Sequence, residues 1–266
     1  MNADEKYLFD LNGYLVIEGV LSEEEVALAN KAIDKHLDQG SIRSSEQTLD
    51  GGSTALKGEI GRGELFGLLE WDAPWCDPFR SMLTHPTLIP YLNDIIGPGF
   101  RVDHQMIMLW MDKGAEGFIF HGSSGPGFDP NQYYIFKNDR MHNGLTVVSF
   151  QLTDVNPGDG GLIVIPGSHK SNYPCPPEMK RYEKHQDHVR QVVCKAGDVV
   201  IFTEAVTHGT LPWTADHPRR STLTRYTAGN MAYVPVKPAP EWANERQKAA
   251  MEPPYHNRLN RPLLEE

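Results

Sequence analysis

Two histidines and one arginine in the second half of the chain have the side-chain chemistry of a metal and carboxylate site. His121 ends the short apolar segment 118–121, and His208 follows soon after the apolar run 199–202. Arg220 begins a segment rich in β-branched residues. Neutral imidazoles are good ligands for Fe(II), and a guanidinium binds a carboxylate through two parallel hydrogen bonds. The three side chains are therefore suited to hold Fe(II) and an anionic co-ligand together.

The arginine has to point into the protein interior to bind such a ligand. Alternate side chains share a face of a strand, so Arg220 and Thr222 should point one way and Arg219 the other. We expect the face of Arg220 to be the inward one, where an arginine needs a bound anion or a carboxylate partner. The alternative is that the histidines are hydrogen-bonded structural residues and that Arg219 and Arg220 are a solvated pair.

The co-ligand that this set predicts is 2-oxoglutarate, a keto acid that chelates ferrous iron and leaves a coordination position for O2. Arg220 and the neighbouring hydroxyl of Thr210 would hold its far carboxylate. Gln151 and Ser149 share one face of a strand expected at 145–152, where they are candidates to contact co-substrate or substrate. The side chains assigned to catalysis, metal binding and co-substrate binding are His121, His208, Arg220, Thr210 and Gln151.

Short strands separated by turns must position these side chains. About seven or eight such segments follow two expected helices, at 23–38 and 86–96. Ser22 and Glu25 form a capping box at the start of the first helix. This order indicates a mainly β protein with flanking helices (α+β), built as a double-stranded β-helix, that is, a cupin-like jelly roll.

The chain is expected to form a single domain over residues 1–266, because it contains no repeat and no second block of alternating elements. Two glycine-rich stretches, about 39–64 and 122–143, are interpreted as lid loops. The proline-rich tail from about 235 to 266 has room for one short helix at 239–250.

Composition limits the classes of partner and compartment. A net charge of −10 without a basic run argues against nucleic acid or an anionic membrane surface. Three cysteines without CxxC spacing favour reduced thiols. The N-terminus is polar and acidic, and no apolar run approaches about 18 residues. We expect a cytoplasmic protein whose partner is a small-molecule substrate, and the oligomeric state is left open.

Several motifs together carry a family resemblance. They are RVDHQMIM, FIFHGS, PGSHK after a GG-containing turn, KAGDVVIFTEAVTHGTLPW and RRSTLTRY. In combination they resemble the phytanoyl-CoA dioxygenase family of Fe(II)/2-oxoglutarate oxygenases, and the resemblance runs from Gly13 to Tyr233. It implies that His121 and His208 bind iron and that Arg220 with Thr210 binds the C5 carboxylate of 2-oxoglutarate.

One position departs from the family pattern. The family carries Asp or Glu two residues after the first histidine, whereas this chain has Ser123 there. A serine hydroxyl is a weak ligand for Fe(II), so the third position is left to water, to an anion, or to Asp129 from the following loop. Relatives with Ala or Gly at that position are radical halogenases, in which chloride binds iron instead.

Three functions remain as hypotheses. The first, which we adopt, is an Fe(II)- and 2-oxoglutarate-dependent dioxygenase that hydroxylates a C–H bond of a small organic substrate and forms succinate. The second is a halogenase of the same family with chloride at the position left open by Ser123. The third is a non-catalytic, cupin-like binding protein. The substrate itself is left open.

Overall fold

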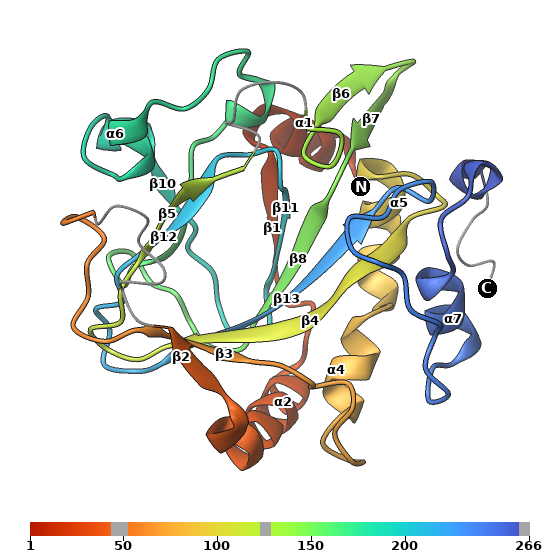
Figure 1. Ribbon diagram of the computed structural model, residues 1–266, viewed down its shortest axis with the longest axis horizontal. Coiled ribbons are helices and arrows are strands. Elements are labelled where there is room, and N and C mark those ends of the chain that lie inside the picture. Colours follow the sequence, from red (N-terminus) through yellow and green to blue (C-terminus); the bar gives the residue numbers. More distant parts are fainter. Residues whose placement is uncertain (44–52, 123–128, 261–266) are drawn as a thin grey trace.

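The computed structural model describes residues 1–43, 53–122 and 129–260, and its centre is a pair of β-sheets (Figure 1). The larger sheet has seven strands in the order β1-β11-β8-β13-β4-β3-β2, and the smaller has four in the order β10-β9-β12-β5. The strands of the larger sheet are β1 (Tyr14–Ile17), β11 (Val199–Thr203), β8 (Thr146–Gln151), β13 (Arg219–Thr227), β4 (Arg101–Met111), β3 (Arg62–Leu65) and β2 (Ser41–Arg43). Those of the smaller sheet are β10 (Arg190–Gln191), β9 (Gly161–Val164), β12 (His208–Leu211) and β5 (Phe118–His121).

The strand pairing is antiparallel throughout both sheets and joins strands that are distant in the chain. β11 lies between β1 and β8, and β12 lies between β9 and β5. The result is the predicted jelly roll in a mainly β protein with flanking helices. The period-two segments of the sequence became strands because one or both of their faces are buried.

The larger sheet has two different buried faces. One faces the smaller sheet, and Val147, Val164 and Phe202 pack together there. The other carries Val148 and Phe150 into a larger apolar core with the helices. In Figure 1 the helices α2, α4 and α5 lie on the side of the larger sheet away from the smaller one. The interior between the two sheets therefore borders the face of the larger sheet that the helices do not cover.

Two helices match expectation closely. α2 (Glu23–His36) begins after the predicted capping box, in which Ser22 and Glu25 bond each other's backbone N–H groups. It ends two residues early, because the chain tightens into the 3-10 turn η1 (Leu37–Gln39). The second expected helix is divided into η2 (Pro86–Leu88) and α5 (Ile89–Ile95).

Two α-helices in the first third of the chain were not predicted. α1 (Ala3–Asn12) has its own capping box between Asn2 and Glu5 and ends at a left-handed glycine, but only Phe9 is buried, so it lacks an apolar stripe. α4 (Asp77–Met82) is too short for its periodicity to show. The remaining helical segments are η3 (Ser168–Lys170), α6 (Pro177–Lys180), η4 (Gln186–His188), α7 (Glu245–Met251) and η5 (His256–Asn260).

The two expected lid loops are wrong where strands occur in them, and their residues 44–52 and 123–128 lie outside the described residues. The first contains β2 and most of β3, and the second contains a hairpin of β6 (Tyr134–Lys137) and β7 (Arg140–Asn143). Asn138 and Asp139 form its turn with φ of 53° and 57°. Asn and Asp tolerate this left-handed geometry, so the polar pair that suggested a loop closes a hairpin instead.

The C-terminal tail packs along the first half of β4. Arg101 donates to the carbonyl of Met231, and the backbone N–H of Tyr233 donates to Asp103. α7 is the short helix expected in this tail, displaced towards the C-terminus. Among the described residues, no helix combines the length and apolar character needed to cross a bilayer.

Candidate metal and co-substrate site

The two predicted histidines lie side by side on adjacent strands of the smaller sheet. β5 and β12 pair in a register that places His208 opposite His121. The centroids of the two imidazole rings are 4.1 Å apart, and the rings are tilted by 54°. Sheet pairing therefore brings together the two side chains that the sequence separates widely.

Each imidazole is oriented by its own strand. Nδ1 of His121 lies 3.2 Å from the carbonyl oxygen of Ile119, and Nδ1 of His208 lies 2.8 Å from that of Val206. A carbonyl oxygen only accepts, so Nδ1 donates in both rings and Nε2 keeps its lone pair. A histidine fixed in this way is in the tautomer that binds a metal through Nε2.

Burial keeps both rings neutral. It lowers the pKa of His121 to about 3, and the neighbouring His208 adds to the effect. Burial also lowers the pKa of His208, against an opposing contribution from Glu204. Neutral imidazoles at neutral pH are the form that metal binding requires.

A carboxylate that the sequence analysis did not select lies beside them. Glu204 is in the turn between β11 and β12, and its side chain is 5% exposed. One oxygen, Oε1, accepts a 2.6 Å hydrogen bond from Nε of Arg225, and Oε2 lies 3.7 Å from Nε2 of His208. The sequence signal for it was slight: a carboxylate four residues before a histidine, across a strand-to-strand turn.

Glu204 is ionised in this setting. Burial by itself would raise the pKa of its carboxyl group, but the guanidinium of Arg225, bonded to Oε1, outweighs that effect and holds the pKa below its usual range. The site thus contains one negative charge next to two neutral nitrogen donors.

His121, Glu204 and His208 fit a divalent metal ion. One ligand atom from each lies within 4.8 Å of the other two, and no second such group of His, Cys, Asp and Glu occurs in the part of the chain that the structure describes. Ligand atoms about 2.1 Å from a shared ion lie roughly 3 Å apart, so modest side-chain rotations reach bonding distance. Two imidazoles and one carboxylate are the donor set of non-haem Fe(II) oxygenases.

The structure contradicts the inward orientation predicted for Arg220. Its guanidinium bonds Asn30 at 3.1 Å and Asp34 at 2.6 Å, both on α2. Alternation along β13 is as predicted, and Arg220 does share its face with Thr222, but this face packs on the helices. The β-branched residues fill the helix-side core, so the inward arginine is Arg219.

Arg219 is 5% exposed and lines the cavity that contains the two histidines. Its Nη1 lies 3.7 Å from the sulfur of Met111, and its Nε has no hydrogen-bond partner among the described residues. Burial lowers the pKa of Arg219 to about 10, with Cys194 opposing and Arg62 adding to the effect. A buried cation in this state is suited to receive a carboxylate.

The other predicted site residues have mixed outcomes. Thr210 lines the same cavity. Gln151 is 2% exposed and donates to the hydroxyl of Ser149 at 2.8 Å, and it is not among the cavity-lining residues. Asp129 accepts from the backbone N–H of Asn131 and does not belong to the metal-binding group. Ser123 lies outside the described residues.

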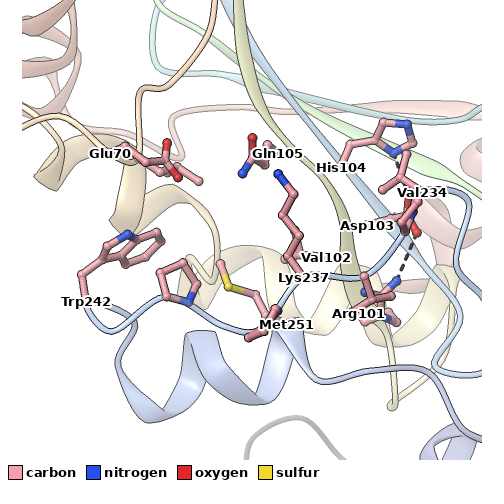
Figure 2. A pocket seen from close by; sticks show the side chains of 15 residues that line it. Glu70, Arg101, Val102, Asp103, His104, Gln105, Val234, Lys237, Trp242 and Met251 are labelled. Atoms are coloured by element: carbon pink, nitrogen blue, oxygen red, sulfur yellow. Dashed lines mark hydrogen bonds and ion pairs between the residues drawn. The ribbon is translucent and has the colours of Figure 1, made fainter.

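Two cavities meet near the site. The one with the histidines has a volume of about 460 Å³. A larger one, about 570 Å³, lies between the start of β4 and the C-terminal tail and is shown in Figure 2. His104 and Gln105 line both. The larger cavity is apolar around Trp242 and Met251, and Lys237 extends towards Gln105 (Figure 2).

The sequence and the fold have clear relatives. Ectoine dioxygenase of Bordetella parapertussis is 23% identical over 284 aligned positions, which cover 93% of this chain and 83% of that protein. The structure of HygX from Streptomyces hygroscopicus with nickel and 2-oxoglutarate bound superposes with a TM-score of 0.68 at 22% identity, covering 85% of this chain and 87% of HygX. The α-ketoglutarate-dependent epimerase SnoN from nogalamycin biosynthesis superposes with a TM-score of 0.58 at 19% identity, covering 85% of this chain and 83% of SnoN.

The model of one protein family matches most of the chain. This is the model for phytanoyl-CoA dioxygenase (PhyH), and the match covers residues 9–221, which include both histidines, Glu204 and Arg219. The chain therefore belongs to the phytanoyl-CoA dioxygenase family of Fe(II)/2-oxoglutarate-dependent oxygenases.

Proposed function

We propose that this protein hydroxylates a C–H bond of a small organic molecule at the cavity between its two sheets. Oxygenase chemistry with iron, 2-oxoglutarate and O2 follows from the family, and the site and the outcome are our proposal. In the net reaction, the substrate C–H becomes C–OH, and 2-oxoglutarate with O2 becomes succinate and CO2. One observation carries the proposal: two neighbouring imidazoles line one cavity with Arg219, which has no carboxylate partner among the residues that the structure describes.

Iron is assigned to His121 and His208. Main-chain carbonyls fix the two rings through Nδ1, which leaves the Nε2 atoms unprotonated and available to a metal ion. When bound there, Fe(II) supplies the activation of O2 that C–H oxidation needs. The protein supplies an oriented and largely water-excluded pocket, because the rings are packed against the aromatic side chains of Phe118 and Phe202.

2-Oxoglutarate is assigned to Arg219 in place of Arg220. The C5 carboxylate would accept hydrogen bonds from the guanidinium of Arg219 and from the hydroxyl of Thr210. Both side chains line the cavity. The pair would restore to Arg219 the anionic partner that its burial calls for, and a charged hydrogen bond of this kind is worth about 1.5–3 kcal/mol.

The substrate is assigned to the larger cavity beyond His104 and Gln105. Its apolar wall around Trp242 and Met251 and its few polar groups fit a small, partly apolar molecule. Because His104 and Gln105 line both cavities, a molecule held there can extend its reactive end towards the histidines. Hygromycin B, which is bound in one HygX structure, shows that this fold accommodates a small-molecule ligand in that protein.

Neither alternative function gains support. Of the relatives described above, one is named a dioxygenase and one an epimerase, HygX binds nickel and 2-oxoglutarate, and none is named a halogenase. A buried carboxylate beside the histidines also removes the reason for placing chloride there. A binding protein without catalysis would not need two neighbouring imidazoles with a buried carboxylate beside them. We also retain the cytoplasm as the proposed location, in keeping with the free thiols of Cys76, Cys175 and Cys194.

The test is anaerobic addition of Fe(II) and then 2-oxoglutarate to the purified protein. A visible charge-transfer band, followed by O2-dependent succinate formation, is expected. Small metabolites would then be screened for faster succinate formation and for a product heavier by one oxygen atom. A protein that binds iron but never forms the band or succinate would contradict the proposal.

A further inference from the structure

We infer that Glu204 is the third iron ligand and replaces the carboxylate that the family takes from the position of Ser123. The inference rests on the proposed function, which supplies the iron and assigns His121 and His208 to it. It moves the carboxylate from the position two residues after His121 to the turn that precedes β12. The metal group then becomes His121, Glu204 and His208, with two of its members on one short segment.

The position of Glu204 is fixed by its backbone. Its N–H donates to the carbonyl of Leu145 at 2.8 Å. The turn that follows is closed by two bonds to Thr203, one from the N–H of Val206 to its carbonyl and one from the N–H of Ala205 to its hydroxyl. A ligand on such a turn is held without the entropy cost of ordering a long loop.

The orientation of the carboxylate is fixed by Arg225. This arginine reaches in from β13 and occupies Oε1 at 2.6 Å. The remaining oxygen, Oε2, faces Nε2 of His208 at 3.7 Å. A carboxylate that needed only an arginine partner would have no reason to direct its second oxygen at two unprotonated nitrogen atoms. The geometry instead leaves Oε2 as the one oxygen of Glu204 that can coordinate a metal ion.

The arrangement also determines which reaction the iron performs. Family members that halogenate lack the carboxylate, and chloride takes its place. In this chain a tethered carboxylate already lies beside both histidines, so a dissolved halide has to compete with a group held at high effective concentration. Glu204 therefore favours hydroxylation despite the serine at position 123.

The decisive variant is Glu204→Gln, which keeps the size of the side chain and an oxygen for Arg225. Its amide N–H2 would face the imidazoles and cannot bind a cation. The probe is Co(II), titrated anaerobically and followed by its visible absorption, with Fe(II) as a second metal. We expect Glu204→Gln to weaken metal binding at least roughly 100-fold, beyond the range seen when only a supporting hydrogen bond is lost.

Asp129→Asn is the matched control, because Asp129 was the other candidate ligand and lies outside the metal group. It should bind Co(II) as the wild type does. Circular dichroism and thermal melting confirm that each variant is folded. Wild-type affinity in Glu204→Gln, or loss of affinity in Asp129→Asn instead, would overturn the inference.

A halide titration gives a second readout. Glu204→Ala should open the coordination position, so that chloride and bromide shift the visible band of its Co(II) or Fe(II) complex, whereas the wild type should not respond. A halide shift in the wild type would overturn the inference. The outcomes also separate the two proposals: if the wild type binds neither metal nor 2-oxoglutarate, the proposed function fails, and if it binds both and Glu204→Gln does too, only the role of Glu204 fails.

Discussion

At the scale of single residues, the site is set by which atom of each side chain remains available. Main-chain carbonyls accept hydrogen bonds from Nδ1 of His121 and His208, and Arg225 donates a hydrogen bond to Oε1 of Glu204. Each bond leaves one possible ligand atom, and these three atoms lie within 4.8 Å of one another. Hydrogen bonds behind a metal ligand fix its tautomer and direction, and their loss weakens binding markedly. Preorganisation of this site thus resides in groups that never touch the ligand.

Replacing either histidine should abolish iron binding. His121→Ala or His208→Ala removes one of two neutral nitrogen donors, and succinate formation should be lost with the metal. Metal content after anaerobic reconstitution and the 2-oxoglutarate charge-transfer band provide the measurement. The exposed His188, replaced by Gln, is the control and should behave as the wild type. Normal iron content in either alanine variant would remove that histidine from the site.

The two adjacent arginines should differ sharply. Arg219→Ala should weaken 2-oxoglutarate binding by about 10- to 100-fold while iron binding persists, because a charged bidentate contact worth about 1.5–3 kcal/mol is lost. Arg220→Ala loses a partly exposed pair with Asp34, so it should cost at most about 1 kcal/mol of stability and leave 2-oxoglutarate affinity unchanged. Anaerobic titration of 2-oxoglutarate into each Fe(II)-loaded variant measures this. The reverse order of effects would restore Arg220 to the site.

At the scale of elements, the turn after β9 joins the N-terminal helix to the barrel. His169 in η3 is 5% exposed, and its Nε2 donates to the carbonyl of Asp10 at 3.0 Å. Gly13, which ends α1 with φ of 80°, lies so close that a Cβ there would be 2.6 Å from Nδ1 of His169. The conspicuous PGSH motif therefore packs the helix α1 against the sheets and takes no part in the metal group.

This histidine should make the fold sensitive to acid. Burial lowers the pKa of His169 to about 4, so the unfolded chain, with a value near 6.5, binds the proton more readily. The contribution of His169 to the free energy of unfolding is fully present above pH 6.5. It falls as the pH drops towards 4, by up to about 3 kcal/mol. Urea unfolding of the wild type and His169→Gln at pH 7 and pH 4.5 should show a smaller acid loss in the variant. The exposed His188→Gln should lose as much as the wild type, and equal losses in all three would contradict the assignment.

At the scale of the whole molecule, the site joins parts that are otherwise held by separate packing. β5 and β12 of the smaller sheet carry the histidines, and β13 of the larger sheet carries Arg219 and Arg225. A metal and 2-oxoglutarate bound between them would tie the two sheets together at the open end of the barrel. Ligands that bind only the folded state stabilise it by mass action.

Loading the site should therefore raise the melting temperature. Ni(II) or Co(II) at one hundred times its dissociation constant should add about 2.7 kcal/mol, which is roughly 5 to 10 °C for a chain of this size. 2-Oxoglutarate should add a further increment only when metal is present. Differential scanning fluorimetry with EDTA as the metal-free reference tests this. A metal-dependent increase that persists in His121→Ala would show that the ion binds elsewhere.

The sequence by itself determined the fold class, the first long helix and the choice of the two histidines as candidate ligands. Alternation of apolar residues predicts a strand wherever one face must be buried, and the capping box of Ser22 and Glu25 is a local signal. A histidine at a strand end is likewise visible in the chain. Short or weakly apolar elements such as α1 and β2 carry no such period, so they were missed.

Only the tertiary structure decided which face of β13 is the interior and which carboxylate joins the histidines. A period of two places Arg219 and Arg220 on opposite faces but does not say which face the helices cover. That choice depends on α2, whose Asn30 and Asp34 accept hydrogen bonds from Arg220. Arg219 on the opposite face of β13 then points into the space between the sheets. Glu204 faces His208 because a turn closed by Thr203 and an arginine from β13 both hold it there. Such convergence is a property of packing, because its partners are far apart along the chain.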